Sequence, residues 1–380
     1  MGSLLISHTA EANDTDKARG AIGSDMSILN RKNNDPVLQV QPAAGHWGTD
    51  DPFLFASHHD DAYPAGNAQQ APPLDQIEGR NLGQDYRRFF GFSMYNGKVV
   101  PGFPLHAHWG YETVTVPTRG YIDHRDSLGN EGRFGFGDVQ WLSAGSRYQH
   151  NEMYPLAFSD RPNPHRTTQI MLNLPLKDKN SPIGLRNFWA ENVPQPQGEG
   201  WRAEVVAGTF AGAAAPAPDR VSWAADPAHR VRIVCFTLAP DARVTVDATV
   251  PTAHRNVYLA DSRGATVAGI TAQNHTRFKL RPDCEFEIVN GDQEAEVWLL
   301  EGNPIGERNS RFGPVVLGSD QEVREAMRTI REREMDEWPW KYVNQAQPRG
   351  SLRFIRYADG HEEHPQHQEP GETAPAAKAL

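Results

Sequence analysis

Short apolar runs separated by turn-forming residues are the feature that most constrains the fold of this 380-residue chain. Each run holds about four to eight residues, which is the usual length of a strand. Glycine and proline are abundant, at 33 and 29 residues, and favour many short strands joined by turns. The runs include 111–116, 139–142, 168–174, 231–238, 286–289 and 297–300. The pattern therefore predicts an all-β sandwich or barrel rather than a helical bundle.

This strand pattern occurs twice, at about residues 85–180 and 200–303, and a proline- and glycine-rich joint at 194–198 separates the two copies. Two small barrels in tandem are the simplest arrangement that explains the repeat. We expect the first barrel to occupy residues 36–196 and the second to occupy 197–312. The polar ends, residues 1–35 and 346–380, are expected to lack fixed structure.

One helix is expected after the second barrel, within residues 313–345. Ser319 and Glu322 have the spacing of a capping box. The apolar residues that follow recur at helical spacing and would pack on a barrel: Val323, Ala326, Met327 and Ile330.

The charge, the hydropathy and the cysteine content indicate which binding partners and which cellular compartment to expect. The net charge is −10 and lysine and arginine form no block, which argues against direct contact with nucleic acid. No apolar run approaches the length of a membrane span, so no membrane association is expected. Two cysteines, Cys235 and Cys284, could form a disulfide, but two buried thiols in a reducing compartment are the favoured interpretation. We therefore predict a cytoplasmic protein, with a nuclear location also open in a eukaryote.

Two pairs of ligand-type residues form the chemical core of the sequence. His106 and His108 are two residues apart in a strand-like segment, and so are His150 and Glu152 about forty residues later. Side chains at positions i and i+2 of a strand project from the same face, so two neighbouring strands could bring all four together inside a barrel. Three imidazoles and one carboxylate suit iron, manganese, nickel, copper or zinc. The alternative for each histidine is an ordinary hydrogen-bonded strand residue, but two such pairs favour a metal site.

The segments around these pairs resemble the signature of the pirin family. The resemblance is dense through the first repeat and sparse through the second, and it extends from about residue 50 to 335. The segments that carry it are 51–55, 101–108, 110–115, 124–130, 137–145, 150–153, 302–307 and 313–316.

The resemblance implies a bicupin, that is, two tandem cupin (double-stranded β-helix, jelly-roll) barrels. In pirins the residues that match His106, His108, His150 and Glu152 hold one iron ion, so Fe(II) is the expected cofactor, with the other first-row metals open. The second cupin is expected to lack metal. Glu112 has the spacing of the ligand carboxylate of many other cupins, and we expect it beside the ligands rather than on the metal.

The chain also departs from the family pattern. Trp109 stands where the signature has arginine, and Tyr148 belongs to a bulkier approach to the third histidine. Together with Trp141, these residues are expected to line a substrate pocket. The connection from residue 56 to 100 is longer than is typical, and it could form an added strand, a lid over the pocket or extra shielding of the barrel surface.

The predicted function is a metal-dependent oxygenase that opens the ring of a flavonol or a related aromatic or enol substrate with dioxygen, as the resemblance to quercetin 2,3-dioxygenase implies. Glu152 would accept a proton from the substrate hydroxyl. One alternative is an iron-dependent transcriptional co-regulator that acts through a protein partner. Another is a cupin isomerase or dehydratase of small-molecule metabolism, because the same scaffold serves many reactions.

Overall fold

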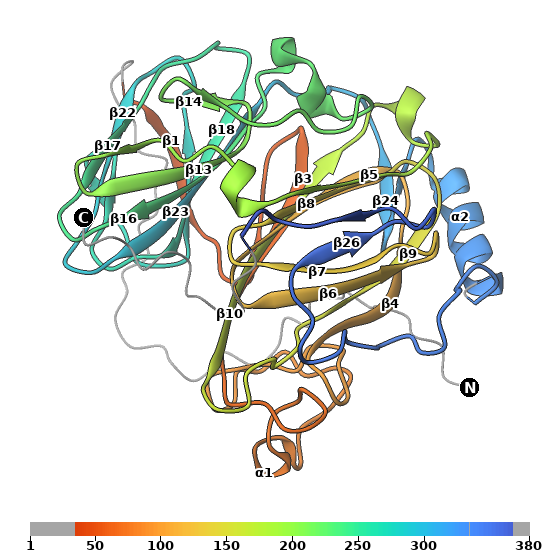
Figure 1. The fold of residues 1–380 in the computed structure, drawn as a ribbon. Coiled ribbons are helices and arrows are strands. Elements are labelled where there is room, and N and C mark those ends of the chain that lie inside the picture. Colours follow the sequence, from red (N-terminus) through yellow and green to blue (C-terminus); the bar gives the residue numbers. More distant parts are fainter. Residues whose placement is uncertain (1–34, 334, 368–380) are drawn as a thin grey trace, which may run out of the picture.

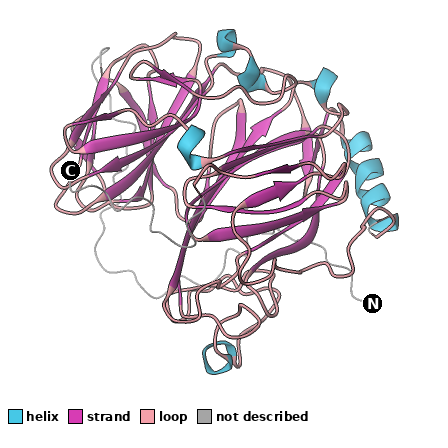
Figure 2. Cartoon of the chain, viewed as in Figure 1, coloured by secondary structure: helices cyan, strands magenta, loops and turns pink. Residues whose placement is uncertain are grey.

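Strands make up most of the regular structure of the chain, as Figure 2 shows. The computed structural model describes residues 35–333 and 335–367. Two barrels lie side by side (Figure 1), and a helix covers the outer side of the N-terminal one. The prediction of an all-β fold of two tandem barrels with a C-terminal helix is confirmed.

The N-terminal barrel consists of two six-stranded antiparallel sheets. One sheet runs, in hydrogen-bonded order, through β11 (Gly184–Phe188), β8 (Val139–Ala144), β5 (Tyr111–Arg119), β10 (Asn163–Asn173), β3 (Phe53–Tyr63) and β2 (His46–Trp47). The other runs through β27 (Glu362–Glu363), β26 (Phe354–Arg356), β7 (Glu131–Gly135), β6 (Tyr121–Asp126), β9 (Tyr148–Met153) and β4 (Gly102–His108).

The C-terminal barrel pairs a seven-stranded sheet with a four-stranded one. The larger sheet runs through β1 (Val37–Pro42), β21 (Thr276–Leu280), β18 (His254–Asp261), β23 (Ala295–Gly302), β16 (Arg232–Leu238), β13 (Trp201–Ala207) and β12 (Gln197–Gly198). The smaller sheet runs through β17 (Arg243–Val246), β22 (Phe286–Val289), β19 (Thr266–Val267) and β20 (Ile270–Thr271). Two short hairpins lie outside these sheets: β14 (Thr209–Phe210) with β15 (Ala213–Ala214), and β24 (Ser310–Phe312) with β25 (Val315–Leu317).

Strand β1 corrects the expected boundary between the barrels. The sequence predicts residues 37–42 as part of the first barrel, but β1 pairs with β21 at the edge of the second, with Val40 opposite Phe278. Val37 is buried in the interior of the second barrel, and burial of its side chain stabilises β1 at this edge.

The two barrels pack against each other through the outer face of one sheet from each barrel: the sheet that contains β5 and β10, and the sheet that contains β16 and β23. Val114 and Ile170 of the first barrel share one apolar cluster with Ile233 and Leu300 of the second. Strands β5, β8 and β10 are therefore covered on both faces, and most of their residues, polar ones included, are buried.

Helix α2 (Asp320–Glu332) begins as the capping box predicts. The Ser319 hydroxyl accepts a hydrogen bond from the Glu322 backbone N–H. Its buried residues Val323, Ala326 and Met327 pack against Val315 and Leu317 of β25. The other helices are short: α1 (Leu74–Ile77) and the 3-10 turns Leu176–Asp178, Ala190–Asn192, Trp223–Ala225 and Pro227–His229. No helix among the described residues is both long and apolar enough to cross a membrane.

The C-terminal segment from residue 346 to 367 is ordered, so the predicted lack of structure from residue 346 is wrong for this part. Strand β26 pairs with β7, and the buried Arg133 guanidinium donates hydrogen bonds to the carbonyl oxygens of Arg349 and Ser351. Such charge-assisted hydrogen bonds fix a polar segment that could not form an apolar core of its own. Residues 1–34 and 368–380, also predicted to lack structure, lie outside the described residues.

Candidate metal centre

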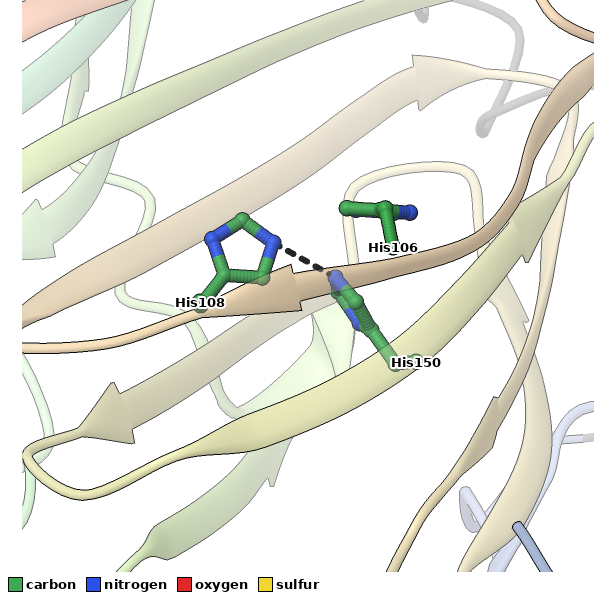
Figure 3. A group of neighbouring side chains, drawn as sticks. All are labelled: His106, His108 and His150. Atoms are coloured by element: carbon green, nitrogen blue, oxygen red, sulfur yellow. Dashed lines mark hydrogen bonds between the residues drawn. The ribbon is translucent and has the colours of Figure 1, made fainter. Parts of the chain in front are cut away.

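Strands β4 and β9 place the predicted ligands on one face. The two strands are antiparallel neighbours, and His106 lies directly opposite His150. Because alternate residues of a strand point to the same side, His108 and Glu152 share that face. Figure 3 shows the three imidazoles directed toward one another from the two strands.

The Nε2 atoms of the imidazoles converge. His108 Nε2 and His150 Nε2 lie 2.9 Å apart, and one nitrogen from each of the three rings fits within a 4.8 Å group. The Oε2 atom of Glu152 lies 3.8 Å from His106 Nε2 and 3.7 Å from His150 Nε2. Neighbouring ligands about 2.1 Å from an octahedral cation lie about 3 Å apart, so small side-chain adjustments would complete the shell.

The outer nitrogen of each imidazole has a hydrogen-bond partner. His106 Nδ1 lies 2.9 Å from the Pro104 carbonyl oxygen, which can only accept, so Nδ1 carries the proton and Nε2 of the neutral ring keeps its lone pair. His108 Nδ1 contacts the Tyr111 hydroxyl at 2.5 Å. His150 Nδ1 lies 3.4 Å from His124 Nδ1. Partners of this kind orient the rings of metal-bound histidines.

Burial keeps two of the imidazoles uncharged. Loss of solvent lowers the pKa of His108 well below its usual range, and the neighbouring His106 lowers it further. Burial likewise lowers the pKa of His150, helped by the three other histidines around it. Neutral imidazole is the form that binds a cation, so the environment prepares both rings for that role.

The carboxylate of Glu152 is held by an amide from the opposite sheet. Gln169 on β10 donates from Nε2 to Oε1 and Oε2 of Glu152 at 3.0 and 2.9 Å. The same amide donates to the Thr115 hydroxyl at 3.0 Å. Gln169 therefore fixes the carboxylate next to the imidazoles without neutralising its charge.

His106, His108 and Glu152 line a cavity with an empty volume of about 790 Å³, including its opening to solvent. Several aromatic and thioether side chains also line the cavity: Phe55, Tyr86, Phe103, Tyr154 and Met171. Part of the long connection thus reaches the cavity through Tyr86, whereas Phe92 and Met94 of the same connection pack against the barrel.

Glu112 and Trp141 do not lie where the sequence suggested. Both point to the outer face of their sheet, between the barrels, where Glu112 accepts hydrogen bonds from Trp141 Nε1, the Ser143 hydroxyl and the Ser222 hydroxyl. The alternation of inward and outward side chains along β4 does not continue into β5, because a turn at Gly110, whose φ is +87°, separates the two strands. Tyr111 therefore faces the imidazoles and Glu112 faces away, so neither Glu112 nor Trp141 touches the cluster or the cavity.

Trp109 and Tyr148 are also absent from the cavity wall. Trp109 packs against α2 and donates from Nε1 to the Asn180 side chain. Tyr148 lies inside the barrel, with its ring 5.4 Å from that of His150, and its hydroxyl donates to Asp126. It supports the cluster from behind rather than lining the space in front of it.

Several residues of the site were missed, although strand alternation could have found some of them. Gln169 and Met171 are the inward positions of an apolar run whose alternate residues, Ile170 and Leu172, face the other barrel. His124 and Asp126 have the same i,i+2 spacing as the ligand pairs, with His124 Nε2 3.5 Å from Asp126 Oδ2.

The residues present fit a first-row divalent cation. Three imidazole nitrogens and one carboxylate oxygen form a donor set of mixed hardness, and the side toward the cavity leaves room for further ligands. Within the described ranges, the three histidines are the one group of at least three histidine, cysteine, aspartate or glutamate side chains close enough to share an ion.

Comparison with known proteins gives consistent matches. The family model described as Pirin matches residues 37–171. A Pseudomonas aeruginosa protein, provisionally named as a quercetin 2,3-dioxygenase, is 30% identical over 237 residues, which cover 61% of this chain and 80% of the relative. A pirin-like protein of Arabidopsis thaliana is 26% identical over 264 residues, covering 65% of this chain and 81% of that protein.

Solved structures agree on the fold. A crystal structure of quercetin 2,3-dioxygenase from Acinetobacter baumannii superposes with a TM-score of 0.59 at 20% identity, covering 79% of this chain and 97% of that one. A second structure of the same description has a TM-score of 0.59 at 18% identity. The two barrels are thus cupin barrels, and on the strength of its sequence matches the chain belongs to the pirin family.

Proposed function

We propose that this chain is a metal-dependent cupin oxygenase acting on a small planar aromatic or enol substrate, a flavonol being the leading candidate. The observation that carries the proposal is the convergence of three imidazoles and one carboxylate beside an aromatic-lined cavity, which His106, His108 and Glu152 border. The provisional names of the relatives point in the same direction.

His106, His108, His150 and Glu152 would hold one divalent ion, with Fe(II) preferred and manganese, nickel, copper and zinc as alternatives. When bound, such an ion supplies Lewis acidity and a site for chemistry with dioxygen. The three histidines set the geometry, because each ring is fixed through its outer nitrogen.

The protein's own groups would bind the substrate and manage its proton. Phe103 and Tyr154, whose ring centroids lie 6.0 Å apart in an edge-to-face contact, offer flat apolar surfaces to an aromatic ring. Glu152 Oε1 or Oε2 would accept the proton of a substrate hydroxyl, since it is the carboxylate that borders the cavity beside the imidazoles. Gln169 would keep this oxygen in place as the proton arrives.

Oxygen consumption by the iron-loaded protein over a panel of flavonols and related catechols tests the proposal. We expect turnover with at least one flavonol, and a loss of about a hundredfold or more in His106→Ala and in Glu152→Gln. His254→Ala, a histidine of the second barrel that hydrogen-bonds the Asp51 carbonyl, is the matched control and should retain activity. Turnover that survives His106→Ala, or no turnover of any flavonol or catechol by iron-loaded protein, would overturn the assignment.

A further inference from the structure

A second cavity lies in the N-terminal barrel, bordered by the start of β6, the turn that follows β7, the connection that precedes β10 and the start of β10. Its empty volume is about 650 Å³, including its opening. Five aromatic rings line it: Tyr63, Tyr121, Phe136, Tyr154 and Phe158. The Tyr121 and Phe136 rings meet edge to face, with centroids 4.8 Å apart. Walls of this kind suit a flat aromatic guest, which gains both apolar burial and ring contacts.

Two nitrogen-bearing side chains give the cavity a polar side. The Arg161 guanidinium lies 4.0 Å from the centroid of the Phe158 ring and places a permanent positive charge at the rim. His165 is buried, with its ring stacked on Tyr154 at 4.0 Å and its Nε2 2.8 Å from the Thr167 hydroxyl. Burial lowers the pKa of His165 to about 3, so its ring is neutral.

His165 can offer a donor to the cavity. When the Thr167 hydroxyl donates to Nε2, the neutral ring carries its proton on Nδ1. Among residues 35–333 and 335–367, no hydrogen bond joins this Nδ1 to another side chain or to the backbone. A Cβ at Gly120 would lie 2.8 Å from His165 Nδ1, so glycine at this position, with φ of +77°, leaves the nitrogen uncovered.

Phe136 adds a conformational argument. It has a φ of 53°, a region that bulky residues rarely adopt, and its ring lines the cavity. Local strain of this kind persists only where the surrounding structure fixes it, and it concentrates at ligand-binding sites.

We propose that this cavity binds a small planar aromatic carboxylate, whose ring lies between the aromatic walls and whose anionic group faces Arg161 and His165. The site is separate from the metal cluster, although Tyr154 lines both cavities. The proposal does not depend on the oxygenase activity, because its recognition groups are not ligands of the metal.

Isothermal titration calorimetry of the full-length protein with 1-naphthoate tests the proposal. We expect saturable binding at one site, weakened about tenfold in Arg161→Gln by loss of the charge-assisted contact and only partly weakened in Arg161→Lys. The uncharged analogue 1-naphthalenemethanol should bind to the wild type more weakly than 1-naphthoate does. Its affinity for Arg161→Gln should equal its affinity for the wild type. Arg161 is exposed, so we expect both variants to fold, which their circular dichroism spectra would check.

Phe55→Ala is the control for binding in the other cavity, because Phe55 lines only the metal cavity. This variant should bind 1-naphthoate like the wild type, whereas Phe158→Ala, which removes one wall of the second cavity, should bind it several-fold more weakly. Equal affinity of wild type and Arg161→Gln, loss of binding in Phe55→Ala, or no binding at millimolar 1-naphthoate would each overturn the proposal.

Discussion

The interior of the C-terminal barrel is filled by apolar side chains such as Phe236, Phe278 and Leu299, all shielded from solvent. The interior of the N-terminal barrel instead contains three imidazoles, a carboxylate and an amide beside an open cavity. Both barrels are antiparallel sandwiches of comparable size. The same architecture therefore encloses an apolar core in one barrel and a polar side-chain cluster beside a cavity in the other.

This difference has an energetic consequence. Apolar burial stabilises the second barrel by about 25 cal/mol for each Å² removed from water. The polar groups of the first barrel gain nothing comparable, because burial of a carboxylate and of lone pairs directed at one another is unfavourable until a partner neutralises them. We infer that the first barrel depends on a bound cation for part of its stability and that the second does not. The following predictions test this contrast.

The largest effect is expected in the apolar core. Phe236→Ala removes a fully buried ring and should lower the free energy of unfolding by about 3–5 kcal/mol, measured by denaturant titration. Leu38→Ala, at an exposed position, is the control and should change it little. The metal content of the folded Phe236→Ala protein should equal that of the wild type. A loss of metal in this variant would show that metal binding in the first barrel depends on the packing of the second barrel.

Metal removal should act on the first barrel. A ligand present at a hundredfold excess over its Kd stabilises the folded state by about 2.7 kcal/mol, so chelation should lower the melting temperature of metal-loaded protein by several degrees. His108→Ala should melt at the same temperature with and without chelator. An equal response to chelator in the wild type and this variant would contradict metal-dependent stability.

The contact between the barrels should give a pH effect of intermediate size. Burial raises the pKa of Glu112 from its ordinary value of 4.5 to about 7, and the hydrogen bonds from Ser143, Ser222 and Trp141 only partly oppose it. Between these two values the folded chain holds a proton that the unfolded chain has released, so rising pH through this window lowers stability.

Glu112→Gln should therefore lose less stability than the wild type between pH 5 and pH 8, by roughly 1–3 kcal/mol in denaturant titrations. Its amide can accept from Trp141 and Ser143 and donate to the Ser222 hydroxyl, so the contact survives. Glu294→Gln, at an exposed carboxylate, serves as the control. Identical pH profiles for Glu112→Gln and the wild type would show that Glu112 does not titrate in this window.

The smallest effect is expected behind the cluster. Asp126→Asn weakens the partner of His124, which in turn orients His150, and should reduce metal affinity about tenfold in a chelator competition assay. Asp138→Asn is the control, because Asp138 is equally buried but has other partners: it accepts from the backbone of Gly135 and Ala190 and pairs with Arg353. Equal losses in both variants would indicate a general loss of packing.

Much of the fold can be predicted from the sequence, because strand alternation and helix capping depend on residues that are close together in the chain. Alternating runs identify the strands, and Ser319 with Glu322 identifies the start of α2. The edge position of β1 and the order of residues 346–367 depend on partners more than a hundred residues away, namely β21 and Arg133. Local patterns carry no information about such pairings.

The same limit explains the outcome at the site. The i,i+2 spacing brings His106, His108, His150 and Glu152 together, because one strand keeps its alternation. It fails for Glu112, because the turn at Gly110 separates two strands. It fails for Trp141 because both faces of that sheet are buried, one against the cavity side and one against the second barrel, so apolarity does not distinguish inside from outside.

Elemental analysis of purified wild type and of the single variants His106→Ala, His108→Ala and His150→Ala tests the central claim most directly. We predict about one first-row metal ion per wild-type chain, and less than about a tenth of that in each variant, because loss of one ligand breaks the shell. Wild-type metal content in any of the three variants would show that the imidazoles on β4 and β9 do not hold the ion.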